Sequence, residues 1–136
     1  MKLKKLMTIL SGAMLLVSFN NVVAANATCP TPDKIRALGS KFSYAYNVVD
    51  YNWILVSDTF SWKDAGWQTI FELSLPGVVD PAMAISMGQE YFNKSPLSTQ
   101  PLSQTYGDKT ECNYSPAKAN YKVQAVTPVA YGIMKH

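Results

Sequence analysis

Histidine and cysteine, the side chains that most often supply a general base, a nucleophile or a metal ligand, are scarce in this chain. The only histidine is His136, the last residue, where ordered structure is least expected. A histidine-based triad or a histidine-rich metal site is therefore poorly supported. The sequence also contains no glycine-rich phosphate loop and no dinucleotide-binding fingerprint. We predict no catalytic residue, no metal site and no cofactor.

Carboxylates are the remaining route to catalysis. Asp58, Asp64 and Glu72 fall within one short stretch, and Asp108 and Glu111 flank a later turn. A glycosidase needs two carboxyl groups facing each other across a cleft at about 5 to 10 Å, and nothing in the spacing indicates such a pair. Solvated turn positions account better for Asp64 and Asp108. The alternative function is a small carbohydrate-active enzyme or cell-wall-binding protein that uses Asp58, Asp64 or Glu72 beside the tryptophans.

All three tryptophans lie in the same stretch, and Trp and Tyr side chains dominate the hot spots of protein interfaces. Trp53 and Trp67 belong to apolar strand patterns, which predicts that they lie in the core. Trp62 stands beside a short loop and is the tryptophan least expected to be fully buried. The predicted candidate binding site consists of Tyr51, Trp62, Lys63 and Asp64.

The first residues have the features of a secretory signal peptide. Three lysines at positions 2, 4 and 5 precede an apolar run over residues 6–19, and Ala25-Asn26-Ala27 offers a cleavage site. We therefore predict a signal peptide over residues 1–27 and one domain over residues 28–136, located in the periplasm or secreted. Cleavage after Ala24 is the second choice, and a membrane anchor is disfavoured because the run is short of the ~20 residues that a spanning helix needs.

Loss of the signal changes the charge of the protein. The whole chain has 12 basic and 9 acidic residues, and three of the basic ones are the lysines of the signal. The mature domain is therefore formally neutral, without an excess of basic residues for nucleic acid or an anionic membrane. We expect no nucleic-acid partner and no membrane insertion after the signal is removed.

The two cysteines predict a single disulfide. Cys29 and Cys112 are expected to pair in an oxidising exported compartment, although two buried or reactive thiols are the alternative. By the chain-entropy argument, a loop of this length would stabilise the domain by about 4 to 5 kcal/mol at most.

Residues 31–39 and 80–93 carry helix signals. Thr31 and Asp80 can each act as an N-cap, and each is followed by a proline that suits the first helical position. Gly39 suits the end of the first helix. In the second helix, the spacing of Met83, Met87 and Tyr91, with Ala84 beside them, predicts an apolar stripe that lies across a sheet.

The remaining segments favour strands, of which a hairpin over residues 53–75 is the centre. Its loop is Lys63–Gly66, and the period of two after the loop predicts that Trp67, Phe71 and Leu73 share a buried face. A strand before the hairpin is predicted to carry Phe42, Tyr44, Tyr46 and Val48 on one side, and later strands are predicted at 104–106, 110–114 and 120–127. The predicted fold is α+β: an antiparallel sheet of about five to six strands, two short helices and one disulfide.

The layout resembles a group of small exported bacterial proteins. It combines a signal, Cys29-Pro30 before a short helix, a Trp-rich middle and Cys112-Asn113-Tyr114 near the end. Within that group the chain is similar to the EirA-type proteins, which are associated with type IV secretion. The resemblance implies a periplasmic accessory role in host-cell infection and carries no catalytic residues. We therefore predict a non-enzymatic module that binds another envelope or host protein.

Overall fold

The computed structural model describes residues 29–129, so the predicted signal peptide and His136 lie outside the described residues. These residues form an α+β domain with an antiparallel sheet, as predicted. The helices and strands, in chain order, are α2 (Pro32–Leu38), β2 (Phe42–Val49), β3 (Asn52–Ser57), β4 (Phe60–Trp62), β5 (Ala65–Ser74), α3 (Pro81–Lys94), β6 (Leu102–Tyr106), β7 (Lys109–Asn113) and β8 (Lys122–Thr127).

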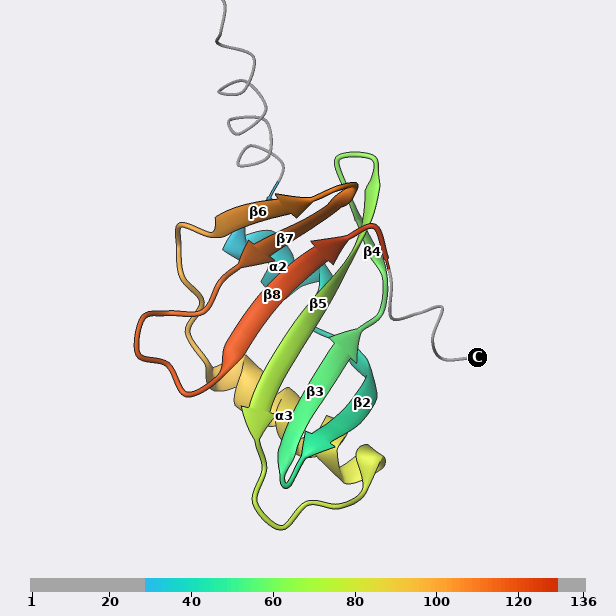
Figure 1. Cartoon of the computed structure of the whole chain (residues 1–136), viewed down its shortest axis with the longest axis vertical. Coiled ribbons are helices and arrows are strands. Elements are labelled where there is room, and N and C mark those ends of the chain that lie inside the picture. Colours follow the sequence, from blue (N-terminus) through green and yellow to red (C-terminus); the bar gives the residue numbers. More distant parts are fainter. Residues whose placement is uncertain (1–28, 130–136) are drawn as a thin grey trace, which may run out of the picture.

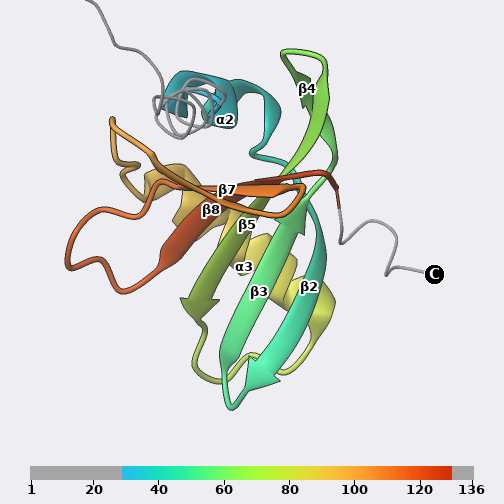
Figure 2. The ribbon, with the colours of Figure 1, turned by 45° about the horizontal axis from the view of Figure 1, so that its top comes forward.

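The sheet has the strand order β2-β3-β5-β8-β7-β6, and the short strand β4 pairs with the start of β5. The predicted hairpin is therefore the centre of the sheet, because β5 contacts β3, β4 and β8. Figure 1 shows α3 lying across one face of the sheet, behind β3 and β5. Figure 2 shows α2 at the same end of the molecule as the projecting β4–β5 turn. No helix within residues 29–129 is long and apolar enough to span a membrane.

A register irregularity in β2 reverses part of the predicted strand face. The sequence pattern placed Phe42 and Tyr44 on one side, but a bulge between them puts them on opposite sides. Phe42 is buried in the core and Ala45 packs against the core from the same side. Tyr44 is paired with Val56 on the other face of the sheet. The prediction of one shared face was therefore wrong, because a bulge shifts the period of two by one residue.

The turn of the central hairpin is tighter than predicted. Lys63 and Asp64 have φ values of 48° and 65°, as the two central residues of a type I′ turn require. Trp62 pairs with Ala65 directly across this turn. Gly66 lies inside β5 and is not a turn residue.

The second helix begins as predicted but buries a different stripe. Asp80 is the N-cap, and its side chain accepts a hydrogen bond from the Met83 amide at 3.0 Å. The buried residues of α3 are Ala84, Gly88 and Phe92, which have the same spacing of four residues as the predicted stripe. Met83 and Tyr91 are exposed, so the predicted stripe was wrong for these two residues. Ala84 is buried and Met87 packs against the core, as predicted.

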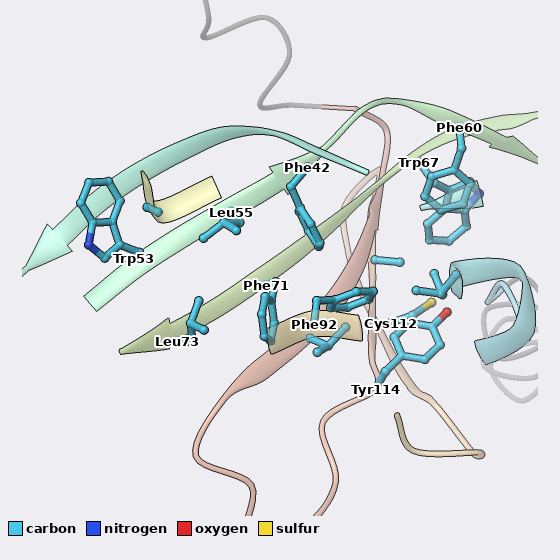
Figure 3. Packing of buried hydrophobic residues seen from close by; sticks show 14 of the residues in the cluster. Phe42, Trp53, Leu55, Phe60, Trp67, Phe71, Leu73, Phe92, Cys112 and Tyr114 are labelled. Carbon is cyan, nitrogen blue, oxygen red and sulfur yellow. The ribbon is translucent and has the colours of Figure 1, made fainter. Parts of the chain in front are cut away.

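The core is centred on an aromatic cluster between α3 and the sheet. Phe92 of α3 meets Phe42 and Phe71 edge to face, with ring centroids 5.0 and 5.2 Å apart. Figure 3 shows these three rings in the space between helix and strands. Trp53 and Trp67 are also buried, as the apolar pattern predicted.

Long-range links hold α2 against the rest of the domain. Cys29 and Cys112 form the predicted disulfide, which joins positions 83 residues apart and excludes the alternative of two thiols. The hydroxyl of Tyr114 donates a hydrogen bond to the Pro30 carbonyl. Arg36 donates to the carbonyls of Phe92 and Ser95 at the end of α3.

We predict that Gly88→Ala destabilises the domain even though alanine is the better helix former. A methyl group at position 88 would collide with Cδ2 of Leu55, which is fully buried. Overpacking a core costs about 1 to 3 kcal/mol, whereas the gain in helix propensity is about 1 kcal/mol. Urea unfolding should show a net loss of stability. The double variant Gly88→Ala/Leu55→Val should lose less than the sum of the two single variants, and strict additivity would contradict the close approach.

We predict that Tyr114 makes the domain sensitive to alkali. Burial raises the pKa of Tyr114 above its usual range, so the folded chain keeps a proton that the unfolded chain releases near pH 10. Stability from this group is therefore complete below about pH 10 and falls as the pH rises further, by at most about 1.4 kcal/mol per pH unit. Tyr114→Phe should be about 1 kcal/mol less stable than the wild type at pH 7, because it lacks the hydrogen bond to the Pro30 carbonyl. Its stability should fall less than that of the wild type between pH 10 and 11, and parallel curves would contradict the prediction.

Candidate functional site

The structure separates the residues of the predicted binding site. Tyr51 lies in the β2–β3 turn, whereas Trp62, Lys63 and Asp64 lie at the β4–β5 turn. Figure 1 shows these two turns at opposite ends of the molecule. The four residues therefore cannot contact one ligand of ordinary size, and each turn has to be considered as a separate surface.

The β4–β5 turn offers little open aromatic surface. Trp62 is half-buried and packs against the core, and the ammonium group of Lys63 lies 5.5 Å from the centre of its ring. Its indole Nε1 is buried, and no acceptor for it is found in the part of the chain that the structure describes. Asp64 is exposed at the tip of the turn. Because Trp62 packs against the core and Lys63 lies over its ring, this turn is the weaker candidate for binding.

The carboxylates of the predicted alternative are also far apart. Asp64 precedes β5 and Glu72 lies near its other end, eight residues later, which corresponds to roughly 26 Å along an extended strand. Asp58 accepts a hydrogen bond from Ser43 and lies 3.8 Å from the Lys41 ammonium group. Asp64 and Glu72 are therefore too far apart to act as the carboxylate pair of a glycosidase. Within residues 29–129, no three His, Cys, Asp or Glu side chains lie close enough to share a metal ion.

The end of the sheet that carries Tyr51 exposes a group of large apolar side chains. We call this group the apolar tip, and its members are Val48, Val49, Tyr51, Val79 and Met83. Val79 is 80% exposed and Tyr51 is 44% exposed. In Figure 1 the β2–β3 turn and the segment that enters α3 lie together at the lower end of the molecule.

Contacts between the two segments hold the apolar tip together. The Leu75 amide donates to the Tyr51 carbonyl at 2.8 Å. The indole Nε1 of Trp53 donates to the Val78 carbonyl at 3.2 Å, which places Val79 beside the start of β3. Leu75 and Val78 are buried beneath the surface. Tyr51 and Val79 are therefore held beside packed, hydrogen-bonded chain and do not lie on a free loop.

The charge around the apolar tip has one sign. Asp50 and Asp80 are exposed at its border, and residues 47–53 and 74–87 contain no lysine or arginine. Asp50 has a φ of 52°, a left-handed conformation that aspartate adopts more readily than most residues. A partner for this surface would need apolar side chains bordered by basic ones.

Sequence reasoning found Tyr51 but missed the other members of the apolar tip. Met83 was expected to face the sheet, and Val48 was expected to lie in a regular strand. A signal exists in the sequence, because Val48-Val49-Asp50 and Val78-Val79-Asp80 repeat the same triplet. The first triplet ends at Asp50 in a turn, and the second ends at Asp80, the N-cap of α3.

Comparisons with protein-family models, with curated proteins and with solved structures found no match to this chain. The resemblance to EirA-type proteins therefore stays a prediction, and the function has to be argued from the surface itself.

We predict that the indole nitrogen of Trp62 contributes nothing to stability. Because Nε1 is buried without a partner among the described residues, Trp62→Phe should change the free energy of unfolding by less than about 1 kcal/mol. The matched control is Trp53→Phe, which loses the bond to Val78 and leaves that carbonyl unpaired, at about 2 kcal/mol. Urea unfolding followed by far-UV circular dichroism measures both. Equal losses in the two variants would show that the Trp62 nitrogen has a partner after all.

Proposed function

We propose that this protein is an exported, non-enzymatic module that binds another protein through the apolar tip. The observation that carries the proposal is the exposure of five large apolar side chains at one end of the sheet, where Leu75 and Val78 are buried beside them. Grouped apolar residues with an aromatic member are typical of the centre of a protein interface. The two bordering aspartates favour a partner whose contact surface is rimmed by lysine or arginine.

The location of the protein forms part of this proposal. The Cys29–Cys112 disulfide supports an oxidising compartment, in agreement with the export signal predicted for residues 1–27. Periplasm and extracellular space both fit. The resemblance to EirA-type proteins adds an accessory role in secretion-dependent infection, with an envelope or host protein as the partner.

Site-specific photo-crosslinking of the full exported chain tests the proposal. A photoreactive amino acid at position 51 should give one discrete adduct with a partner protein in cells, which mass spectrometry identifies. Val79→Asp should reduce that adduct about tenfold or more, because it introduces a charge into the centre of the apolar surface. Val79 is 80% exposed, so the variant should unfold at the same urea concentration as the wild type.

The matched control is Leu102→Asp, which changes a residue of β6 that is 74% exposed and remote from the apolar tip. This variant should leave the adduct unchanged. The double variant Asp50→Asn/Asp80→Asn keeps side chains that suit the turn and the N-cap but removes both charges. It should weaken the salt dependence of the interaction. An adduct that survives Val79→Asp, or that is lost equally in Leu102→Asp, would contradict the proposal.

A further inference from the structure

A groove opens where β5 ends and β8 begins. Tyr121 lines two cavities of about 290 and 190 Å³, and Leu73, Ser74 and Asn120 also line both of them. The loop between β7 and β8 reaches outwards beside the end of β5 in Figure 1 and carries Asn120 and Tyr121. We call these two cavities together the Tyr121 groove. Concave surfaces of this size can hold small ligands or single units of a polymer.

Aromatic rings line the larger cavity. Phe71 forms its floor, and the Tyr121 ring packs edge to face on Phe71 at 5.8 Å between centroids. The Tyr121 hydroxyl donates to the Pro96 carbonyl at 2.6 Å, so the ring is held in place. Burial raises the pKa of Tyr121, and Arg36 and a hydrogen bond with Ser95 oppose this rise in part. Tyr91 of α3 is the other wall and is 52% exposed.

Paired polar groups line the smaller cavity. The Asn52 amide donates to Oε2 of Glu72 at 2.7 Å, which orients the carboxylate. Lys122 is the direct cross-strand neighbour of Glu72. An amide, a carboxylate and an ammonium group here present hydrogen-bond donors and acceptors close together. This arrangement suits a hydroxyl-rich ligand, because each hydroxyl group both donates and accepts a hydrogen bond.

The charged residues that line the groove are balanced. Glu72 is accompanied by Lys122, and Glu90 and Lys94 lie together beside Tyr91 at the other end. Arg36 acts on Tyr121 as a further cation, but its guanidinium group is hydrogen-bonded to the carbonyls of Phe92 and Ser95. Neither a phosphate or acidic polymer nor a basic peptide is therefore favoured by the lining residues. A neutral ligand with a flat apolar face and a hydroxyl-rich edge fits both halves of the groove.

We infer that the Tyr121 groove binds a neutral oligosaccharide. One sugar ring lies against the tyrosine rings in the larger cavity. The hydroxyl groups of the adjacent sugar ring form hydrogen bonds with Asn52, Glu72 and Lys122 in the smaller cavity. This site does not depend on the tryptophans, on Asp58 or on Asp64. It is also independent of the proposed protein-binding function, since Tyr91 and Tyr121 are not members of the apolar tip.

Titration of the full exported chain with the β-1,4-linked trimer of N-acetylglucosamine and with maltotriose, followed by NMR, tests the inference. Chemical-shift changes on addition of at least one of the two sugars should cluster at Ser74, Tyr91, Asn120 and Tyr121. Tyr91→Ala and Glu72→Gln should each weaken binding about tenfold, because one removes a ring and the other a charged acceptor. Tyr106→Ala, which removes a tyrosine of β6 that is 54% exposed, is the matched control and should bind like the wild type.

Several results would overturn the inference. These are the absence of shifts with both sugars, shifts that survive Tyr91→Ala and Glu72→Gln, or a response to the neutral tripeptide Gly-Leu-Tyr in place of the sugars. Tyr91→Ala should not change the photo-adduct formed at position 51. Failure of the sugar site and failure of the proposed protein-binding surface are therefore distinguishable.

Discussion

The covalent bond between Cys29 and Cys112 is the constraint on which the placement of the first helix depends. A helix of seven residues is marginal in water, and only Ile35 of α2 is buried. The bridge brings the start of the chain to β7, and Tyr114 and Arg36 add hydrogen bonds to Pro30 and to the end of α3. With α2 held in this way, its end can approach the sheet so closely that a side chain at Gly39 would collide with Phe60 and Thr69. Gly39 is therefore required for space, since its φ of −114° is open to any residue.

Features that depend on a few neighbouring residues could be predicted from the sequence. The N-caps Thr31 and Asp80, the core face of β5 and the position of the hairpin turn follow from local backbone chemistry, although the turn is shorter than the predicted loop. Features that depend on packing between elements could not. Along α3 two stripes have the same spacing, and the sheet selects the one with Gly88 because this glycine lets the helix approach Leu55. The bulge in β2 likewise has no signature in the residues around Ser43.

The candidate surfaces show the same limit. Tyr51 and Trp62 are eleven residues apart and were predicted to act together, but β3 carries the chain from one end of the molecule to the other between them. Conversely, Glu72 and Tyr121 come together because β5 pairs with β8, a strand that lies much later in the chain, and Tyr91 of α3 lines the neighbouring cavity with Tyr121. Asn52 lines the groove and directly follows Tyr51, so the groove and the apolar tip occupy the same end of the sheet. The loop around Trp62 occupies the other.

The separation of 83 positions between the two cysteines turns most of the domain into one covalent ring. Helices α2 and α3, the central hairpin and the exposed connection from α3 to β6 lie within this ring. A protease that cuts any loop inside it therefore yields two pieces that remain a single molecule for as long as the bridge is oxidised. Outside a reducing cytoplasm, a cut chain can keep both surfaces at the end of the sheet in register, because separation of the pieces needs a reductant as well as a protease.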